Sequence, residues 1–299
     1  MTAEVTVVVL TYNSEQIVAR CLEAIRQGGA EADIIVIDNA SSDRSVETAR
    51  RADPSAQIIE TGSNLGYTAN NLGIARARTP YVLILNPDAE LRPGALRALL
   101  DFADRHPRAA LVGCRLLNPD GSLQHSCFRF PSLTQAFVGF FGVLPLDSER
   151  NGRYALAAYE QPHRVQHALG ACLLVRRAAV DQIGLLDTRF FMYFEETDLC
   201  YRARAAGWEV WYTPDATAVH QGAHSTSRNH EAMSVEFYRS QDRFYRKHYS
   251  GLRHLALRAL RLIGTSYWAA RTLKGLLRRR VSLDVARRRF ASYLAIARL

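Results

Sequence analysis

Continuous apolar runs alternate with helically spaced apolar positions over the first 105 residues. Val5 to Leu10, Ile34 to Ile37 and Tyr81 to Leu85 suit buried strands, and Gln57 to Glu60 is a fourth candidate strand. Between the first two runs, apolar residues recur every three or four positions from Ile17 to Ile25. Strands and helices in alternation are typical of right-handed βαβ units. We therefore predict an α/β fold with a mostly parallel sheet flanked by helices.

Polar side chains follow three of these runs. Asn13, Asp38 and Asp88 each stand just beyond a predicted strand. In open α/β sheets the carboxyl ends of the strands share one edge, where ligands bind. One ligand could therefore contact all three side chains.

Asp88 belongs to the tripeptide Asn86-Pro87-Asp88, in which Pro87 ends the strand. Its carboxylate could bind a divalent metal that bridges to a substrate phosphate. It could equally cap the next helix or close a turn. The same tripeptide at 118–120 is followed by Gly121, and a turn explains that copy fully.

The alternation changes after residue 105. Two apolar stretches around the turn at 118–121 predict a hairpin, and Phe137 to Leu146 suits core, an acceptor-site lid or a patch that contacts lipid. Further elements are predicted as a strand at 165–176 with Gly170-Ala171 in its middle, a helix at 195–206, a strand at 209–213 that ends at Pro214, and a helix at 231–249.

Three acidic residues lie in the first turn of the predicted helix at 195–206, directly after the aromatic sequence FFMYF. Glu195, Glu196 and Asp198 suit the positive end of a helix dipole, which is a purely structural explanation. A carboxylate beside an apolar wall can also have a raised pKa and act as a general base. Farther on, His220 could be a metal ligand or a structural histidine, with His224 four residues later.

Charge is unevenly distributed along the 299 residues. The net charge is +9, but residues 252–299 hold 12 Lys or Arg and one acid, so the remaining chain is close to neutral. Such a tail predicts an anionic partner, either a membrane or a nucleic acid. The near-neutral body and the lack of a nucleic-acid-binding motif argue against nucleic acid.

Several classes of protein are disfavoured. No G-x-G-x-x-G, P-loop or G-x-S-x-G sequence is present, so dinucleotide, P-loop and hydrolase sites are not expected. The five cysteines form no Cys-x-x-Cys pair and are predicted to be reduced core thiols of a cytosolic protein. No signal peptide and no transmembrane helix are predicted.

Seven stretches follow one another along the chain: VVVLTYNS at 7–14, IVIDNASSDRS at 35–45, NLGYTANNLGI at 64–74, LILNPDAEL at 83–91, GACLLVRR at 170–177, FFMYFEETDLCYRARAAGW at 190–208 and VHQGAHST at 219–226. In this order they resemble inverting family 2 glycosyltransferases of the GT-A fold, a Rossmann-like fold, and within them a branch of rhamnosyltransferases. The resemblance covers about residues 4 to 250. It implies a catalytic domain at 1–250, with a nucleotide-sugar half at about 1–105 and an acceptor half at about 106–250.

The resemblance also implies roles for single residues. The donor nucleotide would be held by Thr11, Tyr12, Asn13, Asp38, Asn64, Gly66, Asn70 and Asn86. Asp88 and His220 would bind Mg²⁺ or Mn²⁺, and Glu196 would be the general base, supported by Asp198. Gly170, Ala171 and Glu195 would shape the acceptor or sugar site.

Two departures from the family pattern bear on these roles. Asn86 replaces the first acid of the usual Asp-x-Asp element, which implies weaker metal binding, and a glutamate stands where aspartate is more usual as base. An inactive scaffold is one alternative. A sugar nucleotidyltransferase is another, although the Gly-rich phosphate loop it needs is absent.

The expected reaction is inverting transfer of a sugar to a hydroxyl of a lipid-linked glycan in polysaccharide or cell-wall biosynthesis. The resemblance favours dTDP-rhamnose as donor and leaves UDP-sugars as the alternative. Residues 251–299 are expected to form a basic amphipathic helical extension that binds an anionic membrane surface, with Tyr267 and Trp268 as interfacial anchors. An oligomerisation helix or a solvated tail remains an alternative. The protein would then be cytoplasmic and peripheral on the inner face of the cell membrane, and its oligomeric state stays open.

Overall fold

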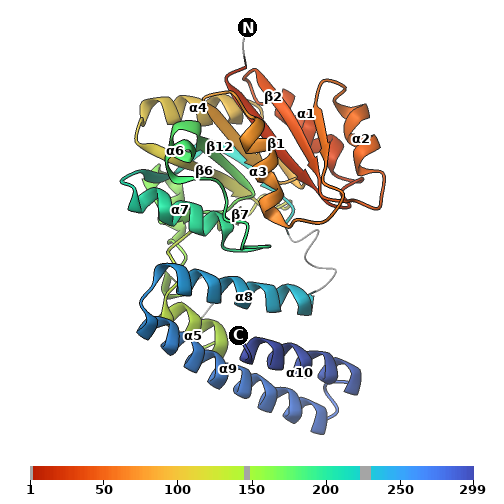
Figure 1. Ribbon diagram of the computed structural model, residues 1–299, viewed down its shortest axis with the longest axis vertical. Coiled ribbons are helices and arrows are strands. Elements are labelled where there is room, and N and C mark those ends of the chain that lie inside the picture. Colours follow the sequence, from red (N-terminus) through yellow and green to blue (C-terminus); the bar gives the residue numbers. More distant parts are fainter. Residues whose placement is uncertain (1–2, 145–148, 223–229) are drawn as a thin grey trace. The chain divides into compact units, whose positions relative to one another are not determined.

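The computed structural model describes residues 3–144, 149–222 and 230–299, which fold into two compact units (Figure 1). The first unit comprises residues 1–129, 154–188 and 195–225, and the second comprises 130–153, 189–194 and 226–299, in each case as far as they are described. The catalytic-domain boundary expected near residue 250 stays a prediction.

The first unit is built on a mixed sheet with the strand order β3-β2-β1-β4-β11-β6-β12-β5. β1, β2, β3 and β4 are parallel, whereas β11 is antiparallel to both of its neighbours, β4 and β6. The strands on this path are β1 Val5–Thr11, β2 Ala32–Asp38, β3 Gln57–Glu60, β4 Tyr81–Leu85, β5 Ala89–Leu91, β6 Ala109–Leu117, β11 Cys172–Arg176 and β12 Glu209–His220. The α/β fold predicted from the alternation is confirmed.

The two faces of β1 are covered by different helices. Val7 and Val9 belong to the core cluster that also contains residues of α1 (Val18–Arg26) and α4 (Ala95–Arg105). Val8 points to the other face, where α3 (Asn70–Arg76) approaches so closely that a side chain on Gly73 would lie 2.5 Å from Val8. Because both of its faces are buried, β1 is apolar throughout most of its length and does not alternate between apolar and polar residues. The helices α2 (Ser45–Ala52), α6 (Arg177–Ile183) and α7 (Glu195–Ala205) complete the unit.

Strand directions bring distant segments to one edge of the sheet. β12 is parallel to β6, and both run in the same direction as β4 because β11 is antiparallel to each of its two neighbours. The carboxyl ends of β1, β2, β4 and β12 therefore share an edge with the amino-terminal end of β11. This edge carries the candidate site.

Two sequence-based boundaries are corrected by the structure. β12 does not end at Pro214 but continues to His220, with a shift in register between Thr213 and Thr217 that accommodates the proline. The strand predicted at 165–176 is interrupted at Gly170-Ala171, between β10 (His167–Ala168) and β11.

The predicted hairpin forms only in part. β6 pairs with β7 (Leu123–Gln124), but β8 (Cys127–Phe128) leaves that pair and joins β10 in a separate two-stranded sheet. The short strand β9 (His163–Arg164) pairs with β12. The helix predicted at 231–249 is confirmed as α8, His230–His248.

The second unit consists mainly of helices (Figure 1). These are α5 (Leu133–Phe141), α8, α9 (Gly251–Leu277) and α10 (Leu283–Ala297). Trp268 joins three of them, because its ring packs on Phe140, Tyr238 and Tyr293, and its indole N–H donates to the Phe140 carbonyl at 2.7 Å.

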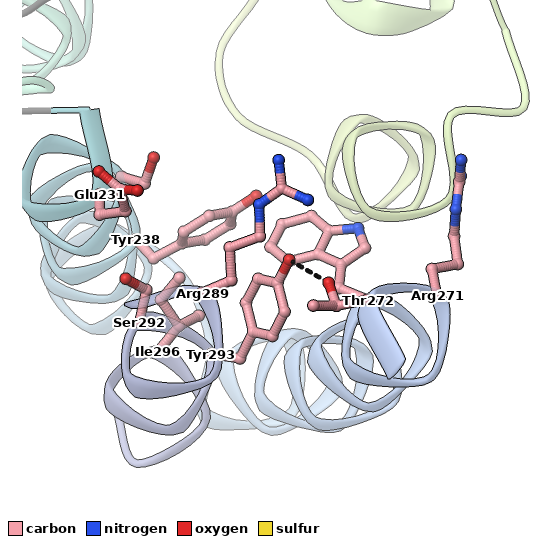
Figure 2. A pocket seen from close by; sticks show the side chains of 10 residues that line it. Glu231, Tyr238, Arg271, Thr272, Arg289, Ser292, Tyr293 and Ile296 are labelled. Carbon is pink, nitrogen blue, oxygen red and sulfur yellow. Dashed lines mark hydrogen bonds between the residues drawn. The ribbon is translucent and has the colours of Figure 1, made fainter. Parts of the chain in front are cut away.

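A cavity of about 680 Å³ lies beside this aromatic joint, between α8, α9 and α10. Figure 2 shows Tyr293 hydrogen-bonded to Thr272 in its wall, at 3.1 Å. The rings around the cavity therefore hold the helices together.

None of the helices in the described parts of the chain is long and apolar enough to span a membrane. The five cysteines are all buried and unbonded, as predicted.

Candidate active site

Asp38 is the centre of a hydrogen-bonded cluster at the ends of β1 and β2. The register pairs Thr11 with Asp38, and the Thr11 hydroxyl donates to Oδ1 at 3.0 Å. Ser41 donates its hydroxyl to Oδ1 at 2.6 Å and its backbone N–H to Oδ2 at 2.9 Å. These bonds fix the orientation of a carboxylate that is only 3% exposed. It is therefore preorganised to accept from a ligand N–H at the sheet edge.

The neighbouring loop is held in place by amide side chains. Asn39 donates to Asn64 Oδ1 at 2.9 Å and to the Gly66 carbonyl at 3.1 Å, and Asn64 Oδ1 also accepts from the Gly66 amide. Gly66 has a φ of 69°, which favours glycine at this turn. These bonds therefore fix the conformation of the loop that carries Asn64 and Gly66.

Three further predicted donor-site residues lie around these loops. Asn13 Oδ1 accepts from the Ser42 amide at 2.8 Å, and Tyr12 exposes its ring beside it. Asn70 donates to the Tyr67 carbonyl at 2.9 Å, but its Oδ1 is buried without a hydrogen-bond partner in the described residues. An unpaired buried acceptor is costly, so this atom is a candidate ligand contact.

The predicted metal residues lie together, although they are distant in sequence. Nε2 of His220 is 3.3 Å from Oδ1 of Asp88 and 3.4 Å from Nδ2 of Asn86. The contact arises because β5, just after Asp88, pairs with the end of β12, so that Ala89 faces His220. Asp88 and His220 are each 7% exposed.

Gln124 determines which nitrogen of His220 is available. Its amide NH₂ donates to the oxygens of Asn118 and His220, at 2.9 and 3.3 Å. Its Oε1 must then face Nδ1 of His220, at 2.7 Å, and accept the proton from that nitrogen. Nε2 is left with its lone pair directed toward Asp88, as in a metal-binding histidine held by an outer hydrogen bond.

The donor set fits a divalent cation that is completed by substrate. A carboxylate and an imidazole supply two ligands, and such ions commonly take further oxygens from phosphates and water. Within the described ranges, no group of three His, Cys, Asp or Glu side chains could hold an ion alone.

Glu196 is placed at the first turn of α7 in an unusual setting. Burial raises the pKa of its carboxyl, although backbone amides of Glu196, Thr197 and Gly170 oppose the rise. Its Oε2 is buried and has no hydrogen-bond partner among the residues described. Two preceding residues, Tyr193 and Phe194, have φ values of 67° and 69°, a strained conformation that directs the chain sharply into the helix.

Gly170 and Ala171 connect these parts of the site. The Ala171 carbonyl accepts from the Asn86 amide at 2.9 Å, and the Gly170 carbonyl accepts from the Tyr67 hydroxyl at 2.5 Å. A side chain on Gly170 would collide with that hydroxyl, so any other residue here would have to displace Tyr67. Since the Gly170 amide also bonds to Glu196, this dipeptide joins the metal loop to the candidate base.

The other acids of α7 have different surroundings. Asp198 is fully buried and accepts from Arg202 at 2.7 Å, while Arg202 also binds the carbonyls of Ile183 and Leu185. This position suits support of the helix rather than contact with substrate. Glu195 is 3% exposed. Burial raises the pKa of the Tyr67 hydroxyl, and the nearby charges of Glu196 and Glu195 raise it further.

Sequence reasoning missed Tyr67, Asn39, Ser41 and Gln124. Tyr67 stands within NLGYTANN, and an aromatic residue in an Asn/Gly loop was a usable signal. Asn39 and Ser41 directly follow Asp38. Gln124 carried no signal, because its role depends on the pairing of β7 with β6. His224, the second histidine candidate, lies outside the described residues.

Comparisons with known proteins identify the family and the fold. The model of the family described as "Glycosyl transferase family 2" matches residues 6–184. The N-acetylglucosaminyl-diphospho-decaprenol L-rhamnosyltransferase of Mycobacterium tuberculosis is 35% identical over 268 residues, which is 84% of this chain and 87% of that protein. Rhamnosyltransferase WbbL of Escherichia coli is 24% identical over 74% of this chain and 84% of its own length.

The fold has solved counterparts. A mannosyltransferase of Pyrobaculum calidifontis, in complex with GDP-Man and Mn²⁺, superposes with a TM-score of 0.58 and 18% identity, covering 99% of this chain and 86% of that one. This similarity shows a GT-A fold.

Proposed function

Because the chain belongs to glycosyl transferase family 2 and is a glycosyltransferase, we propose that it transfers L-rhamnose from dTDP-rhamnose to a hydroxyl of a lipid-linked glycan with inversion. The proposed acceptor is a sugar carried on a prenyl diphosphate, as the name of the Mycobacterium tuberculosis relative states for that protein. The process served would be cell-wall or surface polysaccharide biosynthesis.

The observation that carries the proposal is the environment of the Glu196 carboxyl group. A carboxyl with a raised pKa and an unpartnered oxygen is suited to accept a proton from an acceptor hydroxyl. The deprotonated hydroxyl oxygen attacks the anomeric carbon on the face opposite the diphosphate. The C–O bond to the diphosphate breaks as the new one forms, and the proton remains on Glu196.

The donor would be held by the other groups along the sheet edge. Asp38 would accept from the imide N–H of the base, and Asn70 Oδ1 would contact the nucleotide. Asp88 and His220 would hold Mg²⁺ or Mn²⁺, which when bound offsets the charge that develops on the leaving diphosphate.

Binding to an anionic membrane surface is part of the same proposal and is supported by α9. Its exposed apolar residues gather on one helical face: Leu252, Leu255, Leu262, Ile263, Leu273 and Leu277, between 49% and 77% exposed. Arg253, Arg258, Arg271 and Lys274 are placed along the same helix. An apolar stripe with adjacent cations is typical of a helix that lies in the interface of an anionic leaflet. Attachment to the inner face of the cell membrane would bring the enzyme to its lipid-linked acceptor.

A donor screen with the full-length protein tests the proposed reaction. A synthetic GlcNAc-diphospho-prenyl acceptor is incubated with dTDP-rhamnose, UDP-glucose, UDP-GlcNAc or GDP-mannose, with Mn²⁺, Mg²⁺ or EDTA. We expect nucleoside diphosphate release from dTDP-rhamnose and, by NMR, an anomeric configuration opposite to that of the donor. Transfer only from a UDP-sugar would overturn the donor assignment, and retained configuration would overturn the mechanism.

A further inference from the structure

An uncharged helix lies at the surface of the helical unit. Residues 130–144 contain no Asp, Glu, Lys or Arg, and α5 is the helix that they form. It begins with a capping box of Ser132 and Gln135 and ends at Gly142, which has a φ of 60°. Sequence alone left three roles open for the apolar run from Phe137 to Leu146: core, acceptor-site lid or contact with lipid. The last two residues of that run lie outside the described residues.

One side of α5 is core. Val138 and Phe140 are only 4% and 2% exposed. The ring of Phe140 packs so closely on α9 that a side chain on Gly264 would collide with it. The Phe140 carbonyl also accepts from the indole N–H of Trp268 at 2.7 Å. These contacts fix the rotation of α5 about its own axis, so its opposite side is held facing outward.

The opposite side of α5 is aromatic and exposed. Phe137 is 45% exposed, and Val143, just after the helix, is 55% exposed. The ring centroids of Phe137 and Phe141 lie 4.8 Å apart, and that of Phe141 lies 5.4 Å from the ring of Tyr267 in α9. Three rings therefore form a continuous row from α5 to α9, and Tyr267 is itself 38% exposed.

The row continues into the apolar face of α9. Ile263 precedes Tyr267 by one helical turn and is one of the exposed apolar residues of that face, at 58%. Together, Phe137, Phe141, Val143, Ile263 and Tyr267 are referred to below as the α5–α9 surface. Adjacent exposed apolar side chains on a folded protein mark sites of interaction with a protein or a membrane.

The charges in this unit favour a membrane that contains anionic lipids. The guanidinium of Arg271 lies 5.7 Å from the centroid of the Tyr267 ring, at the border of the α5–α9 surface. Residues 252–299, which include most of α9, hold 12 Lys or Arg and one acid. Aromatic rings bordered by cations are typical of segments that lie at the interface of an anionic leaflet. Because α5 carries no charge, its insertion desolvates none.

We propose that the α5–α9 surface inserts into the interface of an anionic bilayer, so that α5 is a second anchor beside α9. The inference rests on the membrane attachment proposed above and adds to it an anchor without charge. Salt screens the attraction between cations and anionic lipids, but it does not screen the burial of apolar side chains. The contribution of α5 to vesicle binding therefore persists at high salt.

The first test reads insertion at Val143 directly. Full-length protein with Val143→Cys is labelled with nitrobenzoxadiazole, an environment-sensitive fluorophore, and the five native cysteines are buried and so protected from the label. On vesicles of phosphatidylglycerol and phosphatidylcholine we expect a blue shift and quenching by nitroxides on the acyl chains. Leu294→Cys, at a residue 52% exposed in α10, is the control and should show neither. No shift at Val143, or an equal shift at Leu294, would overturn the proposal.

The second test compares vesicle binding of two matched double variants. Phe137→Gln/Val143→Gln removes two apolar side chains of the α5–α9 surface. Leu283→Gln/Leu294→Gln removes two leucines of α10 that are 53% and 52% exposed in the same basic unit. We expect co-sedimentation of the α5 variant to weaken about tenfold or more, by the same factor at about 0.1 M and about 1 M salt, and the α10 variant to be unchanged. An equal loss in both variants, or a loss that disappears at high salt, contradicts an uncharged anchor.

The remaining outcomes separate this anchor from a second copy of the chain and from the proposed function. A blue shift of the Val143 label that grows with protein concentration in vesicle-free buffer would make a second copy the occupant and overturn the proposal. Vesicle binding is measured without donor or acceptor, so failure of sugar transfer counts against the reaction alone. If glutamine substitutions in the apolar face of α9 leave sedimentation unchanged while the Val143 label responds, attachment through α9 fails and the α5 anchor stands.

Discussion

Nε2 of His220 lies 3.3 Å from Oδ1 of Asp88, a contact between the end of the twelfth strand and the loop after the fourth. β11 and β6 separate β4 from β12 in the sheet, and the chain passes from β4 directly into β5, beside β12. Asn86 to Asp88 therefore bridge from the middle of the sheet to its far edge. The single acid of this loop reaches the histidine because of that crossing.

We expect Asp88→Ala and His220→Ala each to weaken metal-dependent donor binding. Each change removes one of two protein ligands, so the dTDP affinity measured by calorimetry in Mn²⁺ should fall toward the value in EDTA. Asp120→Ala is the matched control, because Asp120 stands in a second copy of the tripeptide and its carboxylate accepts from Ser122 within the described part of the chain. Equal affinity with Mn²⁺ and with EDTA in the unsubstituted protein would contradict the metal site.

Glu196→Gln should abolish transfer while nucleotide binding survives. The amide keeps the shape of the side chain but cannot accept the proton, and general-base assistance is typically worth about 10²- to 10⁴-fold in rate. Turnover is measured by nucleoside diphosphate release, with Glu47→Gln on exposed α2 as control. Near-normal turnover in the variant would exclude Glu196 as the base.

The same substitution should raise the melting temperature near neutral pH. A carboxyl whose pKa is higher in the folded than in the unfolded state binds more protons when folded between those two pKa values. Stability therefore falls as pH rises through that window and stays reduced above it, and glutamine removes this loss. Melting curves of both proteins should converge on acidification below the ordinary glutamate pKa. A variant that melts lower at neutral pH, or a constant difference at all pH values, would contradict the buried carboxyl.

Glutamine at Leu255, Leu262 and Leu273 should weaken binding to anionic vesicles. Each leucine withdrawn from lipid loses about 1.5–3 kcal/mol, or roughly tenfold or more in partitioning. Co-sedimentation with phosphatidylglycerol vesicles provides the measurement. Leu156→Gln, at a residue 57% exposed in the other unit, is the control. Equal sedimentation of all variants would refute attachment through α9.

Local sequence patterns were sufficient to predict those elements whose structure is determined within a single chain segment. β1 and β4 could be predicted from continuous apolar runs, because both faces of these strands are buried. α7 could be predicted from the helical spacing of its apolar residues, because one side of the helix is buried. Asp38 and Asp88 could be assigned to one edge, because parallel strands end on the same side.

Features that depend on pairing between distant segments could not be predicted. The Gly170 carbonyl, at the interruption, accepts from the distant Tyr67 hydroxyl, and the orientation of His220 depends on Gln124, a residue of the two-residue strand β7. Pro214 was expected to end a strand, but the register shift in β12 places it where no ladder bond is lost. Non-local contacts of this kind leave no periodic signal in the chain.

The Gly170-Ala171 dipeptide has an evolutionary consequence. It contacts the Asn86–Asp88 loop, Tyr67 and Glu196 through its own peptide groups, so main chain defines the spacing between the proposed metal ligands and the proposed base. Side chains that surround the sugar can then be substituted without displacing these main-chain groups. Such a division allows a lineage to change its sugar by substitution around the pocket, while the chemistry is inherited unchanged.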